Sequence, residues 1–313
     1  MLRVLVLSNM AASAAHPERG RFVRDQVREL ASEPDLAVEM YEFEPGPRAL
    51  LAAATDLRRR YRGVRFDIVH AHFGLTAWAG LTVRCHERAV TLHGTDVSHP
   101  RTRQLTRLVL PRMGLVCAAS QALVDQIPGA RARERARVLP CGVDLDRFRP
   151  IDRGEARAAL ELDPKGPYLL FAADPTRAAK RYDRAVRLAG QTRLLTLGGV
   201  EPQRVPLFVN AANAVLVPSE REGFGLAVLE ALACDVPVLA TPVGAHPLAL
   251  AGVDGALCAP FDVGLWRTAL EEHLRATDPR IEGRSSAERF SAQAMAGQLA
   301  QHWRLLSSAG RVA

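Results

Sequence analysis

Short apolar runs alternate with amphipathic stretches along the first half of the chain. The runs typical of strands cover residues 3–8, 36–43, 67–72, 89–93, 115–119 and 137–141. Between the first two runs, a stripe at the spacing of one helix face consists of Phe22, Val23, Gln26, Val27 and Leu30. Strands that alternate with helices predict βαβ units and a parallel, doubly wound sheet.

The alternation pauses once and then resumes. The stretch from Gly142 to Pro150 breaks the pattern, and strand-like runs return at residues 168–172, 193–197, 214–217, 236–240 and 256–259. Residues 265–274 show an amphipathic helical pattern, and residues 287–306 show a long terminal one. Because 313 residues exceed what one compact core usually holds, we predict two α/β domains, over residues 1–150 and 151–313.

The composition is that of a folded protein with reduced thiols. Apolar residues make up 48% of the chain, which excludes disorder as its main state. The five cysteines are scattered without a Cys-x-x-Cys pair, which favours free thiols in the cytoplasm over a disulfide frame or a zinc site. The N-terminal apolar run is too short for a signal peptide, and no segment has the length of a membrane span. We therefore expect a cytoplasmic protein.

The charge balance indicates anionic partners. A net charge of +7 and a sequence pI near 9.6 favour phosphates, acidic lipid surfaces or nucleic acid. Aromatic residues make up only 5% of the chain, which argues against a stacking platform for single-stranded nucleic acid. We expect no nucleic-acid partner.

Two acids, Glu222 and Glu230, are the most informative pair in the chain. The turn Gly223-Phe224-Gly225 stands between them, after an apolar strand and at the start of a predicted helix. The free N–H groups and partial positive charge of a helix N-terminus favour phosphate. Acids beside a phosphate repel a bare anion, so they require ligand hydroxyls from which to accept hydrogen bonds. A nucleotide sugar supplies both groups.

This region resembles the retaining glycosyltransferases of the GT-B fold, in particular the GT4 family with its E-x7-E signature. The resemblance is carried by the segment from Glu222 to Glu230, by the helix end after it and by the strand at Pro237-Val238. The stretch from Gly142 to Pro150 is similar to the G-V-D-x-x-x-F-x-P sequence that ends the N-terminal domain in that family. The resemblance implies an α/β protein of two Rossmann-like domains with parallel sheets and a cleft between them. It also implies a terminal helix, at about residues 287–307, that packs back on the N-terminal domain. Residues 197–214 lack the strand and helix connection that is usual in the family.

The reaction implied by this resemblance is transfer of a sugar from a nucleotide diphosphate to an acceptor hydroxyl with retention of configuration. The donor is expected to be a UDP- or GDP-sugar and the acceptor a saccharide or a lipid-linked molecule, in polysaccharide or glycolipid synthesis. The departing phosphate assists the reaction on one face of the sugar, so no residue is expected to act as a covalent nucleophile. No metal or other cofactor is expected.

Two cations are expected to hold the departing diphosphate, where they stabilise the transition state. Lys180 matches the lysine of the family, at the start of the helix after the first strand of the second domain. Asp174 stands where the family has an arginine, and Arg177 is the cation expected to reach the same phosphates.

The remaining donor contacts follow from the E-x7-E segment. Glu222 is expected to accept hydrogen bonds from sugar hydroxyls and to act in catalysis, and Glu230 to accept from the ribose. The amides of Gly223, Phe224 and Gly225 are expected to lie near the donor.

Three features of the first domain are candidates for contact with sugar or acceptor. His93, in His93-Gly94-Thr95-Asp96, resembles the His-Gly loop of the family, in which a neutral imidazole hydrogen-bonds a sugar hydroxyl. Gly20 is the candidate for close backbone approach on the acceptor side. We expect His70 and His72 to face opposite sides of their strand, so that at most one of them meets the cleft.

The chain differs from the family pattern at two positions of one turn, and it carries two clusters of arginines. In the turn from Pro242 to Leu248, Gly244 is kept while Ala245 and Leu248 replace a glycine and a glutamate of the family pattern, so the identity of the donor does not transfer. Two clusters of arginines, at residues 58–62 and 131–137, suit either solvated helix faces or peripheral contact with an anionic membrane at its inner face.

Two alternative functions remain open, and two others are disfavoured by the sequence. A nucleotide-sugar epimerase of the same architecture would need no acceptor, and a non-catalytic nucleotide-sugar binding protein would show no turnover. A dehydrogenase is disfavoured because the chain has no G-x-G-x-x-G motif followed by the expected acid. A glycosidase is disfavoured because Glu230 lies inside a phosphate-facing helix rather than across a scissile bond.

Overall fold

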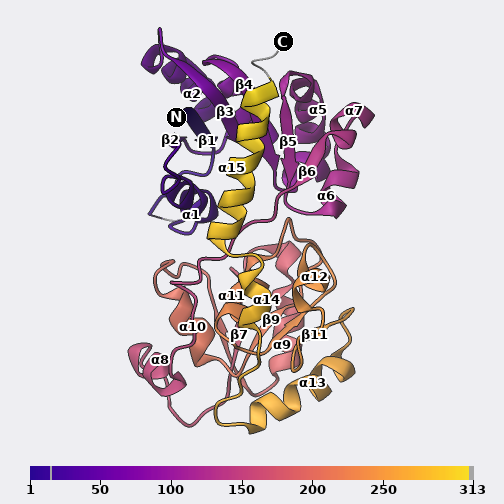
Figure 1. Ribbon diagram of the computed structural model, residues 1–313. Coiled ribbons are helices and arrows are strands. Elements are labelled where there is room, and N and C mark those ends of the chain that lie inside the picture. The colour runs from indigo at the N-terminus through magenta and orange to yellow at the C-terminus, as the bar shows by residue number, and fades with distance from the viewer. Residues whose placement is uncertain (15, 310–313) are drawn as a thin grey trace. The chain divides into compact units, whose positions relative to one another are not determined.

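The chain folds into two compact units, each built on one parallel sheet (Figure 1). The computed structural model describes residues 1–14 and 16–309. The first unit is Met1–Gly142 together with the chain from Ala292 onward, and the second unit is Val143–Ser291. The predicted boundary is at residue 150; in the structure the units change at Gly142, and the chain re-enters the first unit at Ala292.

The sheet of the first unit has the strand order β2-β1-β3-β4-β5-β6. Its strands are β1 (Leu2–Ser8), β2 (Leu36–Glu42), β3 (Arg65–His72), β4 (Arg84–Leu92), β5 (Leu115–Ala118) and β6 (Ala136–Val138). Val4 of β1 lies in register with Val38 of β2 and Ile68 of β3. The apolar runs are nearly continuous because helices cover both faces of a parallel sheet.

Alternate residues of β1 serve the two cores of this unit. Val4 and Val6 pack towards the side of α1 (Arg21–Leu30) and α15 (Ala292–Ala309), and Leu5 and Leu7 pack towards the side of α2 (Pro47–Arg60). Figure 1 shows α15 running beside α1 in this unit, and α15 also contacts β3 and β4. The remaining helices are α3 (Gly74–Gly80), α4 (Thr95–Ser98), α5 (Pro100–Val109), the 3-10 turn η1 (Leu110–Arg112), α6 (Gln121–Gln126) and α7 (Ala130–Glu134).

The sheet of the second unit has the strand order β11-β10-β9-β7-β8. Its strands are β7 (Tyr168–Phe171), β8 (Arg193–Thr196), β9 (Ala214–Val217), β10 (Val238–Ala240) and β11 (Leu257–Cys258). Each predicted strand of both halves overlaps one strand of the structure, and the predicted parallel sheets are confirmed.

The helices of the second unit complete a Rossmann-like layer structure. They are α8 (Arg153–Ala159), the 3-10 turn η2 (Ala178–Lys180), α9 (Tyr182–Ala189), α10 (Val205–Ala211), α11 (Leu226–Ala233), α12 (His246–Leu250), α13 (Val263–Arg275) and α14 (Arg284–Glu288). The expectation that residues 197–214 lack the usual strand and helix connection is wrong for the helix, because α10 forms there. No strand lies between β8 and β9 in this described part of the chain. Pro206 stands in the first turn of this seven-residue helix, where its missing N–H is tolerated, and Val209 is buried.

The predicted single terminal helix over residues 287–306 is wrong in one respect, because α14 and α15 are separate helices. The chain leaves helical geometry between them, where the carbonyl of Phe290 accepts from the amide of Val143 at 2.8 Å. Ser291 forms a parallel bridge with Val143 as well. This pairing with a distant segment competes with the helical hydrogen bonds and breaks the helix.

Half-buried arginine side chains hold the segment from Val143 to Ile151 to the rest of the second unit. Arg284 donates to the carbonyls of Leu145 and Phe148, and Arg280 donates to the carbonyl of Ile151 at 2.7 Å. Each guanidinium thus satisfies carbonyls of a stretch that has no regular structure of its own. No helix among residues 1–14 and 16–309 combines the length and the apolar character that crossing a membrane would require.

Candidate functional site

Three loops meet at the carboxyl edge of the sheet in the second unit. They follow β7, β9 and β10, which are neighbours in the strand order, so their ends lie side by side. The loop after β7 leads to Lys180, the loop after β9 carries Glu222, and the loop after β10 carries Gly244. The amide of Glu220 donates to the carbonyl of Ala179 at 2.9 Å and ties the first two loops together. Crevices outside the carboxyl ends of such strands are where ligands of open α/β sheets bind.

Lys180 and Glu222 form an ion pair within this loop cluster. The Lys180 Nζ lies 2.7 Å from Oε1 and 2.8 Å from Oε2 of Glu222, and the side chains are only 14% and 8% exposed. The hydroxyl of Ser219 donates to Oε1 of Glu222 at 2.7 Å. Burial raises the pKa of the Glu222 carboxyl, but Lys180, Ser219 and His246 together outweigh it, so that the pKa lies below its usual value. Glu222 is therefore a carboxylate at neutral pH.

The loop Gly223-Phe224-Gly225 presents main-chain donors at the N-terminus of α11. Within the described residues, the amides of Gly223, Phe224 and Gly225 donate to no protein acceptor, and no side chain caps the helix. Gly225 has a φ of +103°, and a Cβ there would lie 2.2 Å from Nε2 of His246, so only glycine fits. The three predicted amides are thus brought together beside the Lys180–Glu222 pair, where an anion can accept from them.

The turn after β10 packs against the loop Gly223-Phe224-Gly225. Gly244 has a φ of +60°, and a Cβ there would lie 2.5 Å from the carbonyl oxygen of Phe224. The amide of Ala245 donates to that same oxygen at 2.8 Å. Leu248, which replaces an acid of the family pattern, is 58% exposed.

Sequence reasoning missed three residues of this support: Ser219, Thr241 and His246. The Thr241 hydroxyl donates to the carbonyl of Ser219 at 2.5 Å, and the His246 Nδ1 lies 2.8 Å from the carbonyl of Thr241. A polar residue directly after an apolar strand was the available signal for Ser219 and Thr241. The signal for His246 was a histidine in a turn already noted for its departures.

The other predicted donor residues are Arg177, on the loop after β7, and Glu230, in α11. The side chain of Arg177 is exposed and has no hydrogen-bond or ion-pair partner among the described residues, so it is free to turn towards a ligand. Asp174 accepts from the amide and hydroxyl of Thr176 and closes its own turn. Glu230 lies one turn inside α11 and is half-buried. Arg181 is held by Asp183 and Glu220, which makes it a poor ligand for phosphate.

His93 lies at the carboxyl edge of the sheet in the first unit. Its Nε2 is 3.0 Å from Nδ1 of His72, and the two rings are stacked with centroids 5.2 Å apart. The carboxylate of Asp96 accepts from the amide of His93 at 2.7 Å and from the amide of Gly74 at 2.8 Å. These contacts fix the ring and leave Nδ1 of His93 as the nitrogen available to a ligand.

The expectation that His70 and His72 face opposite sides of their strand is wrong. Residues two apart in a strand point to the same face, and the two rings stack with centroids 5.2 Å apart. The Trp303 indole N–H on α15 donates to Nδ1 of His70 at 2.9 Å, and Nε2 of His70 lies 2.8 Å from the hydroxyl of Thr91. His70 is therefore a core residue that ties α15 to the sheet.

The three stacked histidines are neutral. Burial lowers the pKa of His70 and of His93 well below the usual value, with neighbouring histidines acting in the same direction. Burial lowers the pKa of His72 to about 3. A neutral imidazole at His93 can exchange a hydrogen bond with a hydroxyl without carrying charge.

The close contact at Gly20 in the structure is with the protein's own backbone, at Met10. It precedes α1 with a φ of +68°, and a Cβ there would lie 2.2 Å from the carbonyl oxygen of Met10. Its conformation is thus required by the loop between β1 and α1.

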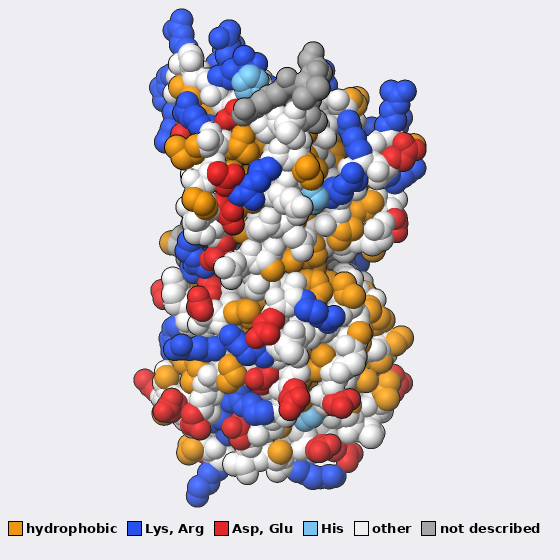
Figure 2. Space-filling view, viewed as in Figure 1, with side chains coloured by type: hydrophobic (Ala, Val, Ile, Leu, Met, Phe, Trp, Pro, Cys, Tyr) orange, Lys and Arg blue, Asp and Glu red, His pale blue; other side chains and the backbone are white. Residues whose placement is uncertain are grey.

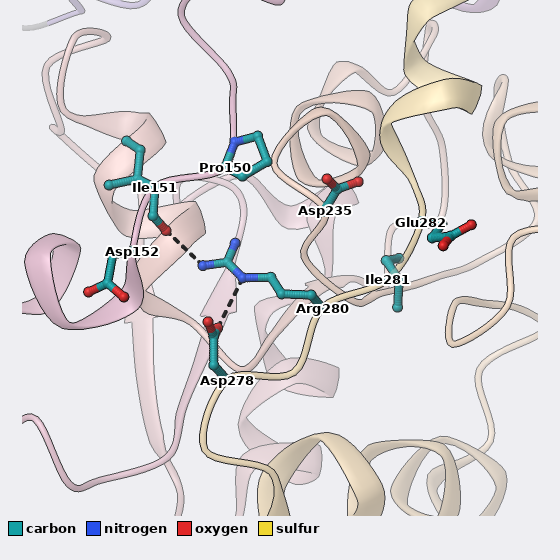
Figure 3. A pocket seen from close by; sticks show the side chains of 8 residues that line it. All are labelled: Pro150, Ile151, Asp152, Asp235, Asp278, Arg280, Ile281 and Glu282. Carbon is teal, nitrogen blue, oxygen red and sulfur yellow. Dashed lines mark hydrogen bonds and ion pairs between the residues drawn. The ribbon is translucent and has the colours of Figure 1, made fainter.

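The cavity drawn in Figure 3 is a different place in the second unit. Its volume is about 470 Å³, and none of its lining residues is a predicted donor residue. Arg280 crosses it and donates to Ile151 and Asp278 within the cavity, and to Asn210 and Cys234 beyond it. Because these donors are already satisfied, Arg280 stabilises the fold rather than a ligand. Among the described residues, no three His, Cys, Asp or Glu side chains are grouped in a way that could hold a metal ion.

The basic clusters of the first unit are exposed (Figure 2). Arg59 is 84% exposed at the end of α2, and Arg60 lies over the rings of Tyr41 and Tyr61. Arg133 and Arg135 donate to carbonyls of their own unit. Most of these arginines therefore pack their side chains on their own unit, and their exposed charged groups can contact an anionic partner.

Each unit is a Rossmann-like α/β domain, and two such domains make up the GT-B architecture. Solved structures of this architecture are similar over nearly the whole chain: sucrose-phosphate synthase from Thermosynechococcus elongatus (TM-score 0.72, 18% identity, 99% of this chain and 100% of that one), and Anabaena Alr3699/HepE in complex with UDP and glucose (TM-score 0.69, 16% identity, 96% and 99%). These likenesses show the fold.

The sequence comparisons give the family. The family model described as Glycosyltransferase Family 4 matches residues 4–147, and that described as Glycosyl transferases group 1 matches residues 158–276. A D-inositol 3-phosphate glycosyltransferase of Actinosynnema mirum is 30% identical over 303 residues, covering 78% of this chain and 73% of that protein. One of Mycobacterium avium is 29% identical over 336 residues, covering 91% and 79%. The chain belongs to the group 1 glycosyltransferases of family GT4, as the E-x7-E resemblance implies.

Proposed function

We propose that this glycosyltransferase moves a sugar from a UDP- or GDP-sugar to an acceptor hydroxyl with retention of configuration. The observation that carries the proposal is the ion pair of Lys180 and Glu222 beside the amides of Gly223, Phe224 and Gly225, which find no acceptor within residues 1–14 and 16–309. A diphosphate suits the ammonium and the amides, and sugar hydroxyls suit the carboxylate. The similar Anabaena structure is a complex with UDP and glucose, which supports a nucleotide-sugar donor here.

The roles proposed for the remaining residues follow the same chemistry. Arg177 joins Lys180 on the departing diphosphate, and Glu230 accepts from the ribose. His93 hydrogen-bonds a sugar hydroxyl through Nδ1, and the loop that contains Gly20 lies on the acceptor side. No metal ion is assigned a role, and the leaving phosphate receives the proton of the acceptor hydroxyl.

The acceptor is proposed to be a polyol, a saccharide or a lipid-linked molecule, in polysaccharide or glycolipid synthesis. The relatives named D-inositol 3-phosphate glycosyltransferase make that cyclitol phosphate the first acceptor to test. The exposed arginines at residues 58–62 would favour a peripheral contact with an anionic membrane if the acceptor is lipid-linked.

The test is an assay for nucleoside diphosphate release from UDP- and GDP-sugars, with and without acceptors that include D-inositol 3-phosphate. Release that depends on the acceptor, with an α-linked product from an α-linked donor by NMR, is the expected result. Isomerisation of the donor without an acceptor would indicate an epimerase instead. Binding without turnover for every acceptor would indicate a non-catalytic nucleotide-sugar binding protein.

A further inference from the structure

His246 lies beneath the loop that carries Glu222, at the start of α12, and its side chain is fully buried. Its Nδ1 is 2.8 Å from the carbonyl oxygen of Thr241. A carbonyl only accepts, so Nδ1 carries the proton and Nε2 of the neutral ring is a bare acceptor. Within the described residues, no donor reaches this buried nitrogen.

An unpaired buried acceptor destabilises a fold, and an apolar side chain of the same shape would avoid that loss. The nitrogen also lies at the loop: a Cβ on Gly225 would be 2.2 Å from it. Features that weaken a fold concentrate at functional sites. The unpaired ring nitrogen beside this loop therefore indicates a functional role for His246.

The charged groups that act on the ring are Glu222, from the loop before α11, and Lys180, from η2. Burial lowers the pKa of His246 most, the Thr241 carbonyl and Glu222 raise it, and Lys180 lowers it, so that the net pKa lies below the usual value. Other elements that pack on α12 carry further titratable or charged side chains, namely Glu230 of α11, Cys258 of β11, and Arg284 and Glu288 of α14.

Binding of a diphosphate changes this balance. The Lys180 ammonium is the cation that compensates the buried Glu222 carboxylate, and the same ammonium is the proposed ligand of the diphosphate. When it turns to the phosphates, Glu222 is left 8% exposed without its cation. A buried carboxylate in that state strongly favours a new positive charge nearby.

We propose that His246 takes up one proton from solvent at Nε2 when a nucleotide sugar binds, and that the imidazolium then replaces Lys180 as the cation beside Glu222. This inference rests on the proposed function, because it requires a diphosphate at Lys180. No covalent bond other than the new N–H forms or breaks. The lysine keeps its three hydrogens, and the added proton offsets part of the charge that the diphosphate brings.

The experiment is calorimetric titration of the whole protein with UDP-glucose and GDP-mannose in buffers of different ionisation enthalpy. Nucleotide sugars are used because their diphosphate diesters do not themselves titrate near neutral pH. We expect proton uptake that approaches one per bound nucleotide sugar near pH 6, and an affinity that rises by up to about tenfold per pH unit on acidification.

The variants His246→Phe and His246→Gln are expected to bind with little proton uptake and with an affinity that is nearly independent of pH. His273→Gln is the matched control, because His273 is another buried histidine of this unit, with its Nε2 on the carbonyl of Gly255 at 2.9 Å. It is expected to keep the uptake. If a His246 variant fails to fold, the NMR titration of the His246 ring in the unsubstituted protein, with and without nucleotide sugar, gives the same answer by a rise in its pKa.

Binding without proton uptake would overturn the inference and leave the proposed function intact. Equal uptake by the His246 variants would also overturn it and would assign the proton to Glu222 or to another group. Failure of both nucleotide sugars to bind would overturn the proposed function and this inference together.

Discussion

The Nζ of Lys180 lies 2.7 Å from a carboxylate oxygen of Glu222, although the two residues are 42 positions apart in the chain. The loops after two neighbouring strands bring them together at one sheet edge. Each residue compensates the buried charge of the other in the absence of a ligand. A diphosphate bound at the proposed site would therefore compete with Glu222 for the lysine, so we expect donor binding to be coupled to the stability of these loops.

Removal of one partner of this pair is expected to be costly. Lys180→Met leaves a buried carboxylate unpaired and is expected to lower the free energy of unfolding by about 3 kcal/mol, while the double variant Lys180→Met/Glu222→Gln recovers most of the loss. Urea unfolding monitored by circular dichroism measures both. Arg275→Met is the control, because Arg275 and Glu271 form an exposed pair (77% and 56%) worth less than about 1 kcal/mol. Equal costs for Lys180→Met and Arg275→Met would contradict the role given to burial.

Glu222→Gln tests the carboxylate as an acceptor for sugar hydroxyls. The amide keeps the size of the side chain but loses the charge, so kcat/KM for transfer is expected to fall by at least about tenfold. Glu220→Gln is the comparison on the same loop, because Glu220 is exposed and pairs with Arg181. Steady-state kinetics with a nucleotide sugar measure both variants, and full activity of Glu222→Gln would remove it from the site.

Gly225→Ala separates steric conflict from backbone strain. A methyl group at Gly225 meets Nε2 of His246 at 2.2 Å in addition to a φ of +103°, whereas Gly199 has a φ of +72° with open space around it. We expect Gly199→Ala to cost about 1 kcal/mol and Gly225→Ala to cost clearly more and to abolish donor binding. Thermal unfolding and nucleotide-sugar titration provide the two measurements. Similar effects of the two substitutions would mean that His246 does not confine the loop.

The stacked histidines of the first unit predict a loss of stability in acid. Burial holds the pKa of His72 at about 3 in the folded chain, against 6.5 for an unperturbed histidine. Between these values the unfolded chain binds a proton that the folded chain excludes, so stability is complete above pH 6.5 and falls as the pH is lowered towards 3. Each such histidine contributes up to about 1.4 kcal/mol per pH unit.

Unfolding in urea at a series of pH values from 7 to about 4.5 measures this slope. His72→Gln is expected to make the dependence shallower, because its side chain does not titrate in that range. His86→Gln, at an exposed position of β4, is the matched control and is expected to keep the slope of the unsubstituted protein. An unchanged slope in His72→Gln would contradict the assignment of a buried neutral imidazole.

The strands and the turn before α11 could be predicted because they depend on local pattern. Runs such as Val4–Leu7 are buried on both faces of a parallel sheet and therefore read as continuous apolar sequence. Gly225 and Gly244 stand out in the sequence as glycines of turns. Their positive φ angles and close contacts leave no room for a side chain, so the turns require glycine at these positions. Lys180 and Glu222 could be placed on one sheet edge because both follow parallel strands of one sheet.

What could not be predicted depends on contacts between distant segments. The break after α14 is made by Val143, which pairs with Phe290 and Ser291 across the unit. The partner of His70 is Trp303, 233 residues away, and nothing near His70 in sequence indicates it. The shared face of His70 and His72, by contrast, follows from strand geometry and was open to prediction.

We propose that the loop before α11 binds the diphosphate of a nucleotide sugar. Titration of the ¹⁵N-labelled protein with UDP-glucose and GDP-mannose, followed by amide chemical shifts, tests it most directly. We predict saturable shifts at Gly223, Phe224 and Gly225 that Lys180→Met weakens at least about tenfold. No shift at these amides at millimolar nucleotide sugar, or shifts confined to the cavity around Arg280, would show that this loop does not bind the diphosphate.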